Sequence, residues 1–88
     1  MTRQLPPWSH QIKTLRRNRN LTQKHLAEQL GVARKIVADW EQGIQEPSPR
    51  RYIQLAKMAP KEQALWFLER IGLSSGFLKH LAAASTKD

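Results

Sequence analysis

Arg34, Lys35 and Asp39 are hydrogen-bonding side chains of both charges that lie close together in one short segment. An arginine or a lysine can donate to the O6 and N7 acceptors of guanine, and an aspartate can accept from the N4 amino group of cytosine. These groups face the major groove of duplex DNA, which is wide enough to admit an α-helix. The three residues could therefore recognise bases if a helix presents them on its outer face.

The first element needed to position them is a short helix between Thr22 and Gly31. Thr22 is the expected N-cap, because its hydroxyl can accept from an unpaired N–H of the first turn. Gly31 is the expected end, because the left-handed conformation that commonly ends a helix costs glycine little. Between them, apolar residues recur on one helical face and predict its burial: Leu26, Ala27 and Leu30.

A second short helix follows the turn at Gly31. Val37 and Trp40 are spaced to face inward, and Ile36 could either contact a thymine methyl group or pack inward. The outward positions are Arg34, Lys35, Ala38 and Asp39. Two helices around a tight turn, with a polar outer face on the second, form a helix-turn-helix, which predicts binding to double-stranded DNA.

Further residues match a known pattern in one register: Ile12, Leu15, Arg16, Thr22, Gln23, Leu26, Ala27, Gly31, Val32, Val37, Trp40, Glu41, Gly43 and the stretch from Pro47 to Ala56. The segment resembles the Cro and lambda-repressor-like helix-turn-helix family. The resemblance implies a compact domain of four or five helices. For the whole chain we expect an all-α bundle of five or six short helices, with the helix-turn-helix at the second and third. It also implies DNA binding, usually as a homodimer, and control of transcription.

The resemblance assigns roles only where this chain matches the family. The base-reading positions correspond to Arg34, Lys35, Ala38 and Asp39. Gln23 resembles a family glutamine that contacts a phosphate or the edge of a base. Arg16 and Glu41 resemble an internal ion pair whose role is structural. Ala33 departs from the pattern, because the family usually has a serine or threonine that caps the recognition helix at this position.

The net charge of +8 predicts an anionic partner, and its distribution favours phosphate contacts. Residues 1–20 hold five basic and no acidic side chains. The expected phosphate contacts are Thr22, Gln23, Arg17, Arg19, Arg50 and Arg51. An alternative for the four arginines is simple solvation, at a helix end for the first two and on the surface for the others.

The chain is expected to have four parts. Residues 1–8 form an N-terminal arm, and residues 9–59 form the helix-turn-helix DNA-binding domain. Residues 60–84 form a helical extension, and residues 85–88 a frayed tail. Within this plan Ser9 is the expected N-cap of a first helix. A later helix is expected to begin at Pro49 with Ser48 as its N-cap, and a further helix is expected to begin near Pro60.

The apolar residues of the extension cover a wider part of its helical surface than packing against one small core requires. Its residues Leu65, Trp66, Phe67, Phe77, Leu78 and Leu81 are expected at an interface, because large apolar patches seldom stay exposed. A two-fold homodimer is the first interpretation, and a fifth core helix is the alternative. A second function class remains open, in which the aromatic residues bind another protein, as in an antitoxin or accessory factor.

Other chemistry is not indicated. The chain has no cysteine, no glycine-rich phosphate loop, no histidine spacing typical of a metal site and no apparent base for a nucleophile. We therefore expect no enzymatic activity, no cofactor and no metal. No stretch has the length and hydropathy of a membrane span or a signal core, so a cytoplasmic protein is expected. The resemblance to the Cro and lambda-repressor-like family implies a bacterial or phage origin. The preferred function is a sequence-specific transcriptional regulator, most simply a repressor.

Overall fold

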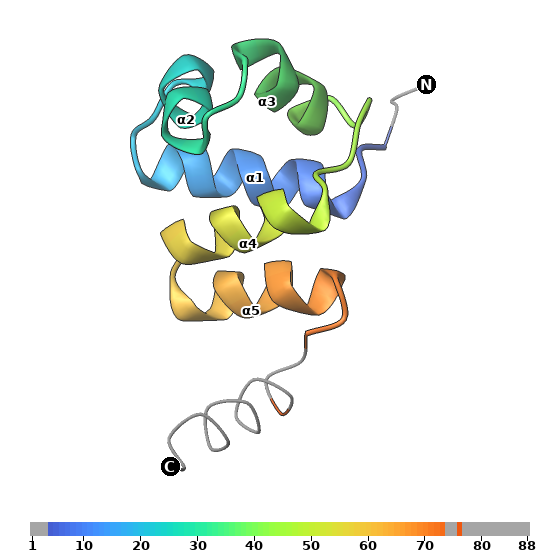
Figure 1. Ribbon diagram of the computed structural model, residues 1–88. Helices are drawn as coiled ribbons and strands as arrows, with labels where there is room; N and C mark the ends of the chain where they lie inside the picture. Colours follow the sequence, from blue (N-terminus) through green and yellow to red (C-terminus); the bar gives the residue numbers. More distant parts are fainter. Residues whose placement is uncertain (1–3, 74–75, 77–88) are drawn as a thin grey trace. The chain divides into compact units, whose positions relative to one another are not determined.

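The computed structural model describes residues 4–73 and residue 76. Within these residues the secondary structure is helical, without strands: α1 is Pro7–Asn18, α2 is Gln23–Leu30, α3 is Arg34–Glu41, α4 is Pro49–Met58 and α5 is Lys61–Arg70 (Figure 1). The predicted all-α class is confirmed. None of the described helices is both long and apolar enough to span a membrane. The additional short helix expected around Phe77 falls outside the described residues.

The chain divides into two units, Met1–Arg51 and Tyr52–Asp88. In the first unit, α3 packs against both α1 and α2 (Figure 1). The apolar residues predicted to face inward are buried: Ile12, Leu15, Leu26, Ala27, Leu30, Val37 and Trp40. The helix-turn-helix is thus held against α1 by buried apolar side chains, and such packing is the main source of stability for helices this short.

The first helix begins earlier than predicted. Ser9 is not its N-cap, because α1 starts at Pro7, a residue suited to the first helical position. The Ser9 hydroxyl is fully buried and donates to the Trp40 carbonyl oxygen at 2.6 Å. Next to it, the Trp8 indole N–H donates to the Gln45 carbonyl oxygen at 3.2 Å. Both side chains connect the start of α1 to the end of α3 and the loop after it.

The start of α4 agrees with its sequence signals. Pro49 is the first residue of the helix, and the Arg51 N–H donates to the Ser48 hydroxyl at 3.4 Å. The predicted N-cap is therefore confirmed. The predicted restart near Pro60 is confirmed as well, since α5 begins at the next residue.

The second unit buries an aromatic pair. The rings of Tyr52 and Phe67 lie 6.0 Å apart, and the Trp66 ring meets Phe67 edge-on at 5.5 Å. Phe67 is completely buried, so its assignment to an accessible interface is wrong. Its apolar ring supplies core packing instead, whereas Leu65 and Trp66 remain half-buried. The other expected interface residues, Phe77, Leu78 and Leu81, lie outside the described residues.

Two glycines in the first unit adopt left-handed backbone conformations for different reasons. Gly31 ends α2 with φ of 74°, and a Cβ atom there would meet no atom within 4 Å. Gly43 follows α3 with φ of 75°, but a Cβ atom there would lie 2.6 Å from Pro6 Cδ. Glycine at position 43 therefore permits both the left-handed backbone conformation and the close approach of the N-terminal segment.

We expect Gly43→Ala to lower the free energy of unfolding by about 1–3 kcal/mol more than Gly31→Ala does, as measured by urea denaturation. Both variants force alanine into the left-handed region, which costs roughly 1–2 kcal/mol. Only the alanine at position 43 also collides with the rigid ring of Pro6. Equal losses in the two variants would contradict the importance of this close approach.

Candidate nucleic-acid interface

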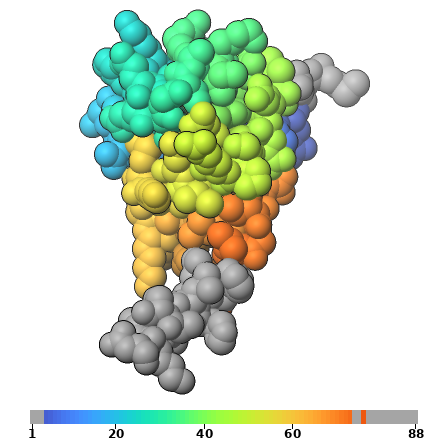
Figure 2. All heavy atoms as spheres, in the orientation of Figure 1, coloured from blue at the N-terminus to red at the C-terminus, as the bar shows by residue number. Residues whose placement is uncertain are grey.

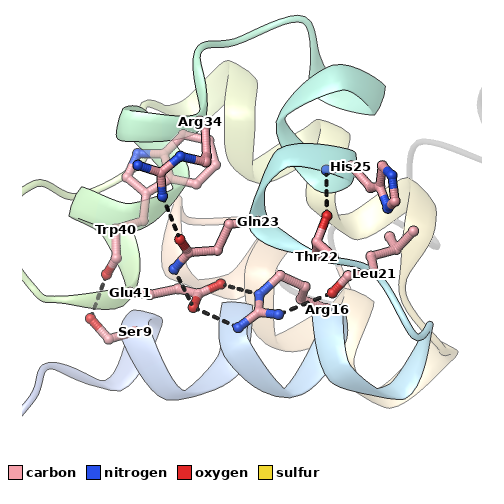
Figure 3. Close-up of polar contacts among 9 residues, drawn as sticks. All are labelled: Ser9, Arg16, Leu21, Thr22, Gln23, His25, Arg34, Trp40 and Glu41. Atoms are coloured by element: carbon pink, nitrogen blue, oxygen red, sulfur yellow. Dashed lines mark hydrogen bonds and ion pairs between the residues drawn. The ribbon is translucent and has the colours of Figure 1, made fainter.

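Local signals in the chain position the helix-turn-helix. The His25 backbone N–H donates to the Thr22 hydroxyl at 3.0 Å, which confirms Thr22 as the N-cap of α2 (Figure 3). At the other end, the Gly31 N–H faces the carbonyl groups of Ala27 and Glu28. Ala33 precedes α3 and provides no side-chain cap, because its methyl group cannot accept a hydrogen bond. The N–H groups at the start of α3 consequently have no serine or threonine hydroxyl as a local partner.

A buried ion pair links α1 to the last residue of α3. Arg16 Nε donates to Glu41 Oε2 at 2.7 Å, and Arg16 Nη2 donates to Glu41 Oε1 at 3.0 Å (Figure 3). The Glu41 side chain is only 2% exposed and the Arg16 side chain 16% exposed. Hydrogen bonding to Glu41 raises the pKa of Arg16 above its usual value. The pair, with its two parallel hydrogen bonds, fixes the geometry between the two helices.

The same arginine also holds the turn before α2. Arg16 Nη1 donates to the Leu21 carbonyl oxygen at 3.0 Å. This bond satisfies a third donor of a guanidinium that is largely removed from water. One side chain of α1 therefore orients both the entry into α2 and the end of α3.

Gln23 extends this network to the outer surface. Its side-chain amide donates to Glu41 Oε1 at 3.2 Å, and its amide oxygen accepts from Arg34 Nη1 at 3.2 Å (Figure 3). Arg34 is exposed at the first position of α3. A hydrogen-bonded chain thus runs from buried Arg16 through Glu41 and Gln23 to Arg34. Sequence reasoning named all four residues but did not connect Gln23 to either neighbour, because α1, α2 and α3 bring them together only through tertiary packing.

The outer face of α3 differs from the prediction at one position. Arg34 and Lys35 are exposed and Ala38 is half-buried, but Asp39 is buried. Lys35 Nζ lies 2.9 Å from Asp39 Oδ2, and the side chains are 80% and 12% exposed respectively. The expectation that Asp39 is an outward base-reading residue is therefore wrong, because its carboxylate is directed to the neighbouring lysine and little of it remains accessible.

The residues expected to contact phosphates have different environments. Arg17, Arg19, Thr22 and Arg50 are exposed, and Gln23 is half-buried in the network. Arg51 is also half-buried, and its Nη1 donates to the Leu30 carbonyl oxygen at 3.0 Å. This contact gives Arg51 a structural role at the end of α2, where free carbonyl groups favour a cation. Figure 2 shows the side chains of α2 and α3 next to each other on one face of the first unit.

Ile36 is half-buried, so its side chain is neither fully packed inward nor fully available to a thymine methyl group. It lines an open pocket of about 300 Å³ together with Val32 and Trp40. The polar wall of this pocket comes from Gln45, Glu46, Ser48 and Arg51. Ile36 thus completes an apolar surface between α3 and the following loop. Within residues 4–73 and 76, no three histidine or carboxylate side chains gather as metal ligands would.

The geometry of α2, the glycine turn and α3 defines a helix-turn-helix protein. A sequence-family model described as helix-turn-helix matches residues 12–59, more than half of the 88 residues. The chain therefore belongs to the helix-turn-helix family, in agreement with its resemblance to Cro and lambda-repressor-like proteins. No curated protein and no solved structure matches the chain. Membership in this family indicates a DNA-binding regulator.

We expect Glu41→Gln to lower the free energy of unfolding by about 2 kcal/mol in urea denaturation, because it leaves the Arg16 cation without its counter-charge. The loss should stay below that of a fully buried pair, since part of Arg16 can still be hydrated. Glu28→Gln is the matched control: the same change at an exposed position of α2 should cost less than about 0.5 kcal/mol. Similar losses in both variants would show that the Arg16 ion pair contributes no more than a surface charge.

Proposed function

We propose that this protein is a sequence-specific transcriptional repressor that binds double-stranded DNA as a homodimer and reads the major groove with α3. The observation that carries the proposal is the exposed Arg34 guanidinium at the start of α3, held by Gln23 in a network anchored on Glu41. In the helix-turn-helix, the N-terminal residues of the second helix approach the base edges. A guanidinium restrained at that place is suited to the two acceptors of guanine.

The other contacts follow from exposure and charge. Lys35 and Ala38 would complete the base-reading surface, with lysine donating to purine acceptors and the alanine methyl group available to a thymine methyl group. Arg17, Arg19, Thr22 and Arg50, which are exposed, would contact phosphates. Phosphate contacts supply affinity without sequence information, because they neutralise the backbone and release counterions.

A dimer is proposed because a single short recognition helix contacts few base pairs, and two-fold pairing doubles the site. The remaining interface candidates are Leu65 and Trp66, which are half-buried, together with Phe77, Leu78 and Leu81. Burial of Phe67 removes this residue from the dimer interface and equally from the alternative surface that would bind another protein. The proposed setting is the cytoplasm of a bacterium, where a dimer on an operator would exclude RNA polymerase.

Selection from a randomised duplex library at near-physiological salt tests the proposal. We expect enrichment of an inverted repeat with half-sites about one helical turn apart. Sedimentation equilibrium of the free protein should show a dimer in the micromolar range. Retention of DNA without enrichment would refute sequence-specific binding, whereas enrichment of a single half-site by a monomer would refute the dimer alone.

Arg34→Ala and Arg17→Ala should separate base reading from phosphate contact. We expect Arg34→Ala to reduce the preference for the selected site over random duplex by about tenfold, with a smaller loss of affinity for random DNA. Arg17→Ala should weaken both complexes alike and reduce the slope of log K against log salt by about one. Fluorescence anisotropy at several salt concentrations measures both quantities. Equal losses on selected and random DNA for Arg34→Ala would contradict its role as a base-reading residue.

A further inference from the structure

A second polar contact on α3 lies outside the Arg16 network. Lys35 Nζ is 2.9 Å from Asp39 Oδ2, one helical turn further along the same helix. The lysine side chain is 80% exposed, whereas the aspartate side chain is 12% exposed. The fixed member of the pair is therefore the carboxylate, and the ammonium group is the member that can reach a ligand.

We infer that Asp39 sets the base preference of Lys35 without contacting DNA itself. The inference rests on the proposed function, because it concerns the surface that would face the major groove. A carboxylate this buried and already bonded to an ammonium group is poorly placed to accept from cytosine N4. Asp39 is a positioning residue that acts through Lys35.

The chemistry of the pair favours guanine. A lysine ammonium has three donors, and the bond to Asp39 leaves two of them for the DNA. Guanine offers two adjacent acceptors in the major groove, O6 and N7, whereas adenine places an amino donor beside its N7. Two N–H donors held at one point can bond to both guanine acceptors, whereas at adenine one of them would face the amino donor. A lysine without this restraint can swing its flexible stem toward a phosphate, which carries no sequence information.

The same carboxylate lowers the attraction of α3 for DNA in general. Asp39 offsets the charge of Lys35, so the pair contributes little net positive charge toward the phosphates. Removing the carboxylate charge should therefore change specificity and nonspecific affinity in opposite directions. A residue with a purely structural role would not do this, because loss of folded protein weakens binding to every duplex.

The experiment compares Asp39→Asn, Lys35→Met and the double variant with the wild type. A randomised library of DNA duplexes is selected with the wild type and with Lys35→Met. The position in the DNA site at which the wild type prefers one base and Lys35→Met does not is assigned to Lys35. At that position we expect Asp39→Asn to reduce the preference for guanine over adenine by about three- to tenfold. Its affinity for random duplex should rise severalfold, with a salt slope steeper by up to about one. Thermal unfolding of each variant confirms that it is folded.

The double variant tests whether Asp39 acts through Lys35. In the Lys35→Met background, Asp39→Asn should leave the base preference at the assigned position unchanged. An unchanged guanine preference in the single variant Asp39→Asn would overturn the inference, and so would a further change in the double variant. Failure of the wild type to enrich any sequence would instead refute the proposed function.

Discussion

The Glu41 carboxylate is the group on which the arrangement of the first unit depends. An ionised carboxylate that is almost completely removed from water is costly unless charges and donors replace its hydration. Arg16 supplies the charge from α1 and Gln23 supplies a further donor from α2. Because Glu41 itself ends α3, three helices must meet at one point for the carboxylate to be satisfied. Apolar packing alone would tolerate small shifts between these helices, whereas this polar network does not.

That constraint explains how a short helix can present a defined polar surface. Arg34 would otherwise sample many rotamers, and its ordering on binding would cost free energy. Its bond to Gln23 connects it to the buried part of the network. Ala33 provides no cap that could stiffen the start of α3 locally. The order at the start of the proposed recognition helix therefore comes from tertiary contacts rather than from its own sequence.

This difference also explains which features could be predicted from the sequence. Thr22, Gly31 and the Ser48-Pro49 pair act on the backbone within a few residues, so their roles were visible without the fold. The burial of Val37 and Trp40 follows from helical periodicity. The roles of Ser9 and Phe67 were predicted wrongly because their partners lie on other helices. The role of Asp39 was predicted wrongly because this residue lies at the edge of the buried face of α3. Periodicity does not specify on which side such a boundary residue falls.

In the proposed function, the charges of the first unit would give nonspecific DNA affinity and sequence specificity to different residues. On α3, Lys35 is paired with Asp39 and Glu41 with Arg16, so Arg34 is the one basic side chain of this helix that is not opposed by a carboxylate. The exposed positive charges of Arg17, Arg19 and Arg50 lie outside α3. A recognition helix with little net charge gains little from an arbitrary phosphate, so its binding energy depends on matching the base edges. In the proposed function, the flanking arginines would attract any duplex, while α3 would discriminate among sequences.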